Sequence, residues 1–271
     1  MGSLPRRIGG TRIPRCHIRL LGQGASDKPG LFINQDDQVA APALLIEQLE
    51  APVFLSGISF GGLIALRYAI EHGNRLAGLA LMSTFAELSP QLLLLGNALR
   101  TGLTLGGTSY LQDLLLPMNL SDAWLGPQLS NLEAVKRQGW LTNDVYALQN
   151  LMESFLEFKP LTPQLSAITI PTMIMNGEFD FLTPRTLHET LRLQIPDSPL
   201  VIIPRAFHAF TLEKPALTAD LLSRFAEDVL SGKWNGNRSV WIAPEQAGDP
   251  LIPFPPGHDH LRAIPAHEVP A

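Results

Sequence analysis

The strongest structural signal in this chain is the segment Val53-Phe54-Leu55-Ser56-Gly57-Ile58-Ser59-Phe60-Gly61-Gly62. An apolar, β-prone run leads into the pattern G-x-S-x-G, and apolar residues then recur at helical spacing over residues 63–70. This strand, turn and helix is the setting in which the pattern forms a nucleophile elbow, with Ser59 projecting above a sheet. Because the sharp turn leaves little room for side chains, we expect Gly57 and Gly61 to be needed. The alternative is an ordinary turn-forming loop.

The composition of the chain fits a single soluble domain. Its 271 residues, of which 45% are hydrophobic and 17% charged, suffice for one large core. A net charge of -5 without a Lys- or Arg-rich run argues against a nucleic-acid partner. Cys16 is the single cysteine, which excludes an internal disulfide and a cysteine-based metal site. Residues 1–14 lack the apolar core of a secretory signal, and glycines and polar residues interrupt the leucine-rich residues 92–105. We therefore expect no membrane span and a cytoplasmic location.

Strands and helices are expected to alternate along most of the chain. We expect strands at residues 53–55, 77–82, 172–175 and 200–203, and helices at residues 35–49, 62–71, 186–194 and 216–230. This rhythm predicts an α/β fold with a doubly wound, mostly parallel sheet, built from residues 1–82 and 161–232. Residues 83–160 have helical patterns without a convincing strand, so we expect an inserted helical lid. Residues 233–271 are rich in Pro and Gly and are expected to form an irregular tail. Its expected anchors are Trp234, Trp241 and Phe254.

Two further polar residues follow expected strands, at the same edge of the sheet as Ser59. Asp180 comes just after the strand at 172–175, and His208 just after the strand at 200–203. A serine hydroxyl becomes a strong nucleophile when a histidine accepts its proton, and a carboxylate holds that histidine in the correct tautomer. Serine, acid and histidine also occur in the chain order typical of such an elbow. Singly, Asp180 fits a turn and His208 a surface histidine, but jointly they favour a Ser-Asp-His triad.

These motifs give the chain a resemblance to the α/β-hydrolase fold superfamily, over about residues 20–232. The segments that carry it are the loop Gly22-Gln23-Gly24-Ala25-Ser26-Asp27-Lys28-Pro29, the elbow at Ser59, the acid motif Gly177-Glu178-Phe179-Asp180 with Thr183-Pro184, and His208 before Leu212-Glu213-Lys214-Pro215. The resemblance implies a serine hydrolase with a helical lid. In it, Ser59 is the nucleophile, Asp180 the orienting acid and His208 the general base, and no cofactor is implied.

A second resemblance leaves the reaction open. Residues 30–39 and Asn176-Gly177 are similar to the group that includes the 3-hydroxyacyl-ACP:CoA transacylases and the synthase of the rhamnolipid lipid moiety. The leading hypothesis is an esterase or lactonase that cleaves a carboxylic ester, lactone or thioester. The alternative is an acyltransferase acting on 3-hydroxyacyl thioesters. The leucines of residues 92–120 favour a small-molecule substrate with an apolar acyl group, unless they only pack the lid onto the body.

The N-terminal segment is short for this superfamily, whose members usually carry further strands there. Residues 1–21 have room for about one strand, expected at residues 16–20, so we expect the other N-terminal strands to be missing. The backbone N–H of Phe60, beside Gly61, is the expected donor to the oxyanion of a tetrahedral intermediate, and residues 22–25 are a substitute source of the second donor. A third hypothesis follows: a truncated relative without catalysis, whose exposed sheet edges favour a homo-oligomer.

The histidines outside the triad give no convincing metal site. The motif His258-Asp259-His260 has no third ligand at a suitable spacing, so we expect no metal. His17, His72 and His188 are expected to be surface or packing histidines.

Overall fold

A six-stranded sheet forms the centre of the molecule. The computed structural model describes residues 7–8, 11–12, 16–28, 32–50, 52–142 and 144–255. The sheet contains, in spatial order, β3 (Val53–Ile58), β4 (Leu76–Met82), β5 (Thr172–Gly177), β6 (Leu200–Ile203), β7 (Val240–Ile242) and β8 (Ile252–Pro253). The strands β3 to β7 are parallel, and β8 is antiparallel to β7. Outside this sheet, β1 (Arg7–Ile8) and β2 (Thr11–Arg12) pair with each other.

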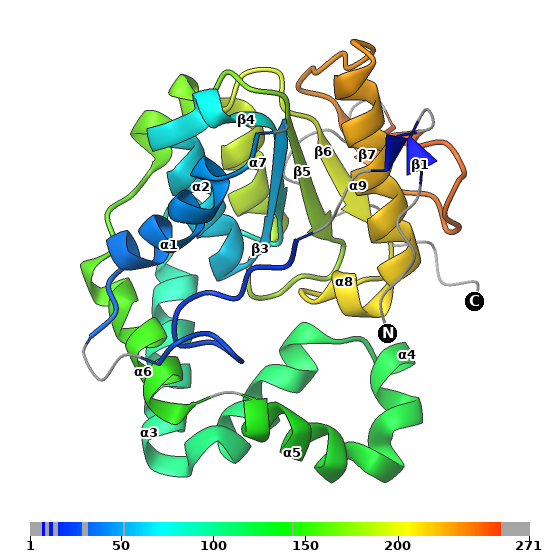
Figure 1. Cartoon of the computed structure of the whole chain (residues 1–271). Coiled ribbons are helices and arrows are strands. Elements are labelled where there is room, and N and C mark those ends of the chain that lie inside the picture. The colour runs from blue at the N-terminus through cyan, green and yellow to red at the C-terminus, as the bar shows by residue number, and fades with distance from the viewer. Residues whose placement is uncertain are drawn as a thin grey trace.

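Helices cover both faces of this sheet (Figure 1). One face is covered by α1 (Gln35–Glu47), α2 (Phe60–His72) and α7 (Arg185–Gln194), with the short 3-10 helix η1 (Gly73–Arg75) after α2. The other face is covered by α8 (Phe210–Glu213) and α9 (Pro215–Leu230). The predicted α/β fold with a mostly parallel, doubly wound sheet is therefore confirmed.

The strand β4 supplies side chains to two separate cores. Successive side chains of a strand point to opposite faces of the sheet. Leu79 and Leu81 belong to the core under α2 and α7, whereas Ala80 and Met82 belong to the core under α9. A parallel strand covered on both faces is expected to be an almost continuous apolar run, which explains why the sequence of β4 has no polar residue.

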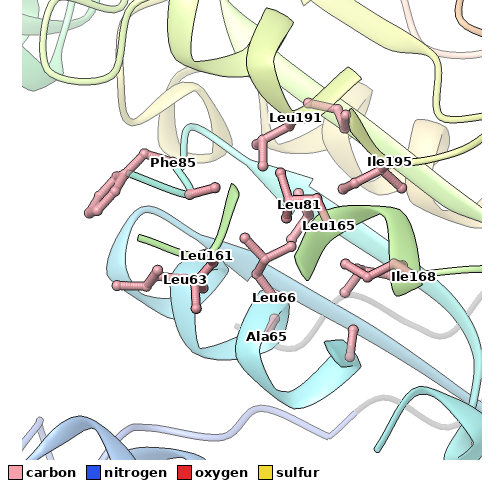
Figure 2. Packing of buried hydrophobic residues seen from close by; sticks show 14 of the residues in the cluster. Leu63, Ala65, Leu66, Leu81, Phe85, Leu161, Leu165, Ile168, Leu191 and Ile195 are labelled. Atoms are coloured by element: carbon pink, nitrogen blue, oxygen red, sulfur yellow. The ribbon is translucent and has the colours of Figure 1, made fainter. Parts of the chain in front are cut away.

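The 3-10 helix η4 (Thr162–Ala167) seals the first of these cores. It precedes β5 and packs against both α2 and α7. Figure 2 shows Leu165 and Ile168 packed with Leu66 of α2 and Leu191 of α7. All four side chains are at most 1% exposed, so η4 fixes the point at which the chain returns to the sheet.

A layer of helices lies at one end of the sheet, between β4 and β5 in the chain (Figure 1). Its elements are α3 (Pro90–Asn119), α4 (Asp122–Leu125), η2 (Gly126–Asn131), α5 (Leu132–Thr142), α6 (Val145–Ser154) and η3 (Phe155–Glu157). The long helix α3 is broken at Gly107, whose φ of 67° and ψ of -167° are not helical. Within the described residues, no helix is long and apolar enough to cross a membrane.

Residues 16–20 form no strand, so that expectation is wrong. The chain beside them is held instead by Gln38 of α1, whose side-chain amide accepts from the N–H of Leu21 at 2.9 Å and donates to its carbonyl at 3.0 Å. These backbone groups are therefore paired with a helix rather than with a neighbouring strand. In the described part of the chain, no strand pairs with the outer side of β3.

The expectation of irregular structure after residue 232 is wrong for β7 and β8. β7 pairs in parallel with β6, and β8 returns along β7. The three expected anchors do contact the body: Trp234 and Trp241 pack against the core under α9, and Phe254 is buried in the other core. β7 exists because β6 offers it a partner edge, and β8 because β7 offers it one, not because of their own short sequence pattern.

Candidate active site

Ser59 lies in the tight turn between β3 and α2. Its φ of 54° and ψ of -124° are unusual for a residue other than glycine. The N–H of Ser59 donates to the carbonyl of Met82 at 2.9 Å. Its carbonyl accepts from the N–H of Gly62 at 2.9 Å and from the hydroxyl of Thr84 at 2.8 Å. These bonds hold the candidate nucleophile in the conformation that an elbow requires.

Gly57 and Gly62, rather than Gly61, make this turn possible. A Cβ at Gly57 would lie 2.3 Å from the carbonyl oxygen of Gly61, and a Cβ at Gly62 would lie 2.6 Å from the Cβ of Thr84. Apart from its two chain neighbours and the backbone of its own helix, no described residue has a heavy atom within 4 Å of a Cβ placed at Gly61. The expected need for a glycine is therefore confirmed at position 57 and wrong at position 61.

The two glycines give a matched pair of stability predictions. We expect Gly57→Ala to lower the free energy of unfolding by about 3 kcal/mol or more, because the new methyl group meets backbone that cannot move aside. Gly61→Ala is expected to leave it unchanged or to raise it by up to about 1 kcal/mol, since alanine is the better helix former. Urea unfolding followed by circular dichroism measures both values, and equal midpoints would contradict this account of the turn.

Asp180 lies in the loop after β5 and is 4% exposed. Its carboxylate accepts from the N–H and the hydroxyl of Thr183 at 2.9 and 2.8 Å, and from the side-chain amide of Asn176 at 3.2 Å. Both of its oxygens lie 3.0 Å from Nδ1 of His208. Burial alone would raise the pKa of Asp180, but the hydrogen bond from His208 and the positive charge on that ring lower it below its usual value. Asp180 is therefore ionised at neutral pH and accepts the Nδ1–H of His208.

His208 lies in the loop after β6 and is 6% exposed. The hydroxyl of Ser83, which follows β4, donates to its backbone carbonyl at 2.9 Å. The backbones of the loops that carry Asp180 and His208 lie close together at Gly177. A Cβ at this position would lie 2.2 Å from the carbonyl oxygen of Phe207. A side chain at position 177 would push the two loops apart, so this glycine fixes the spacing of the acid and the histidine.

The side chain of His188 connects the elbow with the acid loop. It is fully buried on α7, its Nε2 accepts from the N–H of Thr84 at 2.9 Å, and its Nδ1 lies 3.3 Å from the carbonyl oxygen of Pro184. Because a neutral imidazole has one N–H, Nδ1 carries the proton and donates to Pro184. Thr84 also binds the carbonyl of Ser59, so His188 joins the loop behind the serine to the loop of Asp180.

Burial lowers the pKa of His188 to about 4. The sequence signal for its burial, though not for its partners, is its position between Leu187 and Leu191, both buried on the same helix. A titratable residue at a core position needs fixed hydrogen-bond partners, because an unpaired buried polar group is costly.

The pKa of His188 predicts how stability depends on pH. Between about pH 6.5 and 4, the unfolded chain binds a proton at this residue and the folded protein does not, so stability falls as the pH is lowered through this range. The full effect is about 3 kcal/mol. We expect His188→Gln to remove this part of the pH dependence, and His72→Gln, at a partly exposed histidine, to retain it. Urea unfolding of the three proteins between pH 4 and 7 tests this, and an equal slope in all three would contradict it.

Ser59 and His208 line one cavity of about 210 Å³. Its other walls are mostly apolar and come from the start of α2, the loops after β4 and β5, the helices α3 and α6, and η3. The described residues include no hydrogen bond between the Ser59 hydroxyl and His208. Such bonds are often long or poorly aligned before substrate binds, so the shared cavity is the informative observation here.

Phe60 begins α2 and lines this cavity. The first N–H groups of a helix have no partner within the helix, so those of Phe60 and Gly61 are available beside the serine. The described residues that line the cavity include none from residues 22–25. The N–H groups of the first two residues of that segment donate to carbonyls of the same turn, so the structure does not support the expected second oxyanion donor there.

Among the described residues, no group of three His, Cys, Asp or Glu side chains is placed to hold a metal ion. The motif His258-Asp259-His260 lies outside the described residues. His17 is exposed, and the ring of His72 lies 5.0 Å from that of Tyr68, so these two histidines have surface and packing positions as expected.

A serine held in a strand-to-helix elbow at the edge of a parallel sheet is typical of α/β hydrolases, and this fold places the chain in that class of enzymes. The model of a family described as serine aminopeptidase, S33, matches residues 20–215. The chain belongs to that family, and the expectation of an α/β-hydrolase enzyme is confirmed.

Individual relatives point to the same class. The chain is 27% identical to a pimeloyl-(acyl-carrier protein) methyl ester esterase of Neisseria meningitidis, over 93% of this chain and 76% of that protein. Among solved structures, it is similar to MGS-M2, an α/β hydrolase from a Medee basin deep-sea metagenome library, with a TM-score of 0.69, 25% identity and coverage of 76% and 77% of the two chains. A thermophilic esterase from Thermogutta terrifontis has the same fold, with a TM-score of 0.68 and 24% identity over 78% of each chain.

Proposed function

We propose that this enzyme is a serine hydrolase that cleaves a carboxylic ester, lactone or thioester with an apolar acyl group. Ser59 attacks the carbonyl carbon while His208 takes the serine proton, and Asp180 stabilises the resulting imidazolium. His208 then gives this proton to the leaving alcohol or thiol as its bond to the acyl carbon breaks, which leaves the acyl-enzyme. A water molecule gives a proton to the neutral His208 and attacks the acyl carbon, and His208 returns that proton to Ser59 as the acid is released. The observation that carries the proposal is the pair formed by His208 Nδ1 and Asp180, at 3.0 Å, beside a cavity that Ser59 lines.

The cavity wall supports an apolar acyl group. Residues 83–160 act as a lid, because α3 and α6 supply most of the side chains that face the serine across the cavity. An alkyl chain that packs against the leucine and phenylalanine side chains there is removed from water, which favours its binding. The similar protein from Neisseria meningitidis that is named as an esterase adds support for ester cleavage.

The nucleophile is tested by labelling the purified chain with a fluorophosphonate probe. Labelling is expected in the wild type and in Ser56→Ala, which changes an exposed serine of β3, and is expected to be absent in Ser59→Ala. Labelling that survives in Ser59→Ala would contradict the assignment of the nucleophile. A folded wild type that takes up no probe would instead support the hypothesis of a relative without catalysis.

Product analysis separates hydrolysis from acyl transfer. With a 3-hydroxyacyl thioester and an added alcohol or thiol, hydrolysis predicts the free acid as the product of the Ser59-dependent reaction. An acyl group found on the added acceptor would favour the acyltransferase alternative, because the acceptor would have replaced water at the acyl-enzyme.

A further inference from the structure

Arg100 differs in charge from the other described residues that line the cavity. The wall contains no aspartate or glutamate from the described chain, and Arg100 is its one lysine or arginine there. Most of the remaining wall consists of leucine, phenylalanine and methionine side chains. The cavity therefore combines an apolar body with one fixed positive charge on α3.

The guanidinium of Arg100 has no partner among the described residues. Arg100 as a whole is half-buried; its Nε is buried and makes no hydrogen bond, and its side chain forms no ion pair with a described carboxylate. A buried polar group that loses water without gaining a partner lowers stability, so proteins rarely retain one without a reason. An arginine on an apolar wall is accounted for if a ligand supplies the missing acceptor.

The position of Arg100 suggests where that acceptor lies. The residues of α3 that line the cavity near its start run from Leu92 to Arg100. Eight residues of an α-helix rise by about 12 Å, so this part of the wall is about that long. Asn97, about one turn before Arg100 on the same helix, also lines the cavity and adds a side-chain amide to its wall. An elongated substrate can therefore cover the leucines of α3 with its alkyl part and place a polar end at Arg100.

We infer that the preferred substrate carries a carboxylate on its acyl chain, and that Arg100 is a specificity-determining residue that binds this carboxylate. The inference rests on the proposed ester cleavage at Ser59. A guanidinium is planar and donates two parallel N–H bonds, a geometry that matches a carboxylate. Surrounding apolar side chains strengthen such a pair because they exclude water, and a substrate without the carboxylate leaves the guanidinium unpaired.

Two esters of equal chain length test the inference. The p-nitrophenyl half-ester of adipic acid ends in a carboxylate, whereas p-nitrophenyl hexanoate ends in a methyl group. We expect the wild type to favour the half-ester by about 10- to 100-fold in kcat/KM. Arg100→Gln is expected to lower this ratio by the same factor, and Arg100→Lys to retain part of it because the positive charge remains.

Arg137→Gln is the matched control. Arg137 is an exposed arginine of α5 that does not line the cavity, so its loss changes the net charge equally and should leave the ratio at the wild-type value. A ratio that is the same in the wild type and in Arg100→Gln would overturn the inference. Turnover of neither ester by the wild type, or turnover that persists in Ser59→Ala, would instead overturn the proposed function. Because each variant is judged by a ratio of two substrates, a general loss of folded protein cancels out.

Discussion

Ser59→Ala is expected to lower kcat for ester hydrolysis by a factor on the order of 10⁶, the loss seen when a triad serine is removed. Alanine lacks the hydroxyl that becomes acylated, and the remaining reaction depends on water attacking a substrate held in the cavity. The fold should survive, because the hydrogen bonds that hold the turn use only the backbone of Ser59. Steady-state kinetics with p-nitrophenyl hexanoate measures the loss, and unfolding in urea confirms that the variant is folded.

The outcome that would contradict this prediction is a fall of less than about tenfold in a folded variant. Another nucleophile would then be needed, and the strained backbone of Ser59 would have no catalytic purpose. Ser56→Ala provides the comparison, since it removes a hydroxyl from the same segment but from an exposed position on β3.

Asp180→Asn is expected to lower kcat by about 10⁴-fold while leaving KM nearly unchanged. The asparagine amide would donate to Nδ1 of His208, which forces the ring proton onto Nε2 and leaves no acceptor for the serine proton. Thr183 can still donate to the remaining side-chain oxygen, so the loop should keep its shape. Asp228→Asn, at an exposed position on α9, is the control and should retain wild-type kinetics.

The lowered pKa of Asp180 adds a pH test to this variant. The ionised carboxylate is favoured in the folded protein, so its contribution to stability is present above its ordinary pKa of 3.8 and is lost as the pH falls through the lower folded value. Asp180→Asn should therefore lose less stability on acidification than the wild type. Equal acid sensitivity in the two proteins would show that the interaction with His208 does not lower the pKa of this carboxyl.

The parts of the fold that the sequence predicts well are those with strong local patterns. The strand β4 can be predicted from its apolar run, because burial on both faces leaves few alternative residues. The elbow can be predicted from Gly57, because a side chain at that position would clash with the backbone. The strand β7 could not be predicted in this way. Three residues within a proline-rich segment have no measurable periodicity, and they form a strand because β6 lies beside them.

In the candidate site, too, the features with a local sequence pattern could be predicted, and those that depend on contacts between distant segments could not. Asp180 and His208 could be predicted because each follows a strand, and strand order brings their loops together. His188 could not, because its partners Thr84 and Pro184 come from two different loops and the contact exists only in the folded protein. The sequence predicts a need for glycine at position 61, whereas the structure requires glycine at position 62. This difference has a similar cause, since the requirement at position 62 comes from the side chain of Thr84.

Most of the cavity wall and the candidate triad come from different stretches of the chain. Ser59, Asp180 and His208 follow strands β3, β5 and β6, whose register is fixed by backbone pairing. The wall on α3 and α6 belongs to one continuous insertion between β4 and β5. Insertions of this kind tolerate changes in length and sequence at little cost to the domain that carries them. We therefore expect that an exchange of residues 90–157 changes which molecules enter the cavity and leaves Ser59, Asp180 and His208 in place at the edge of the sheet.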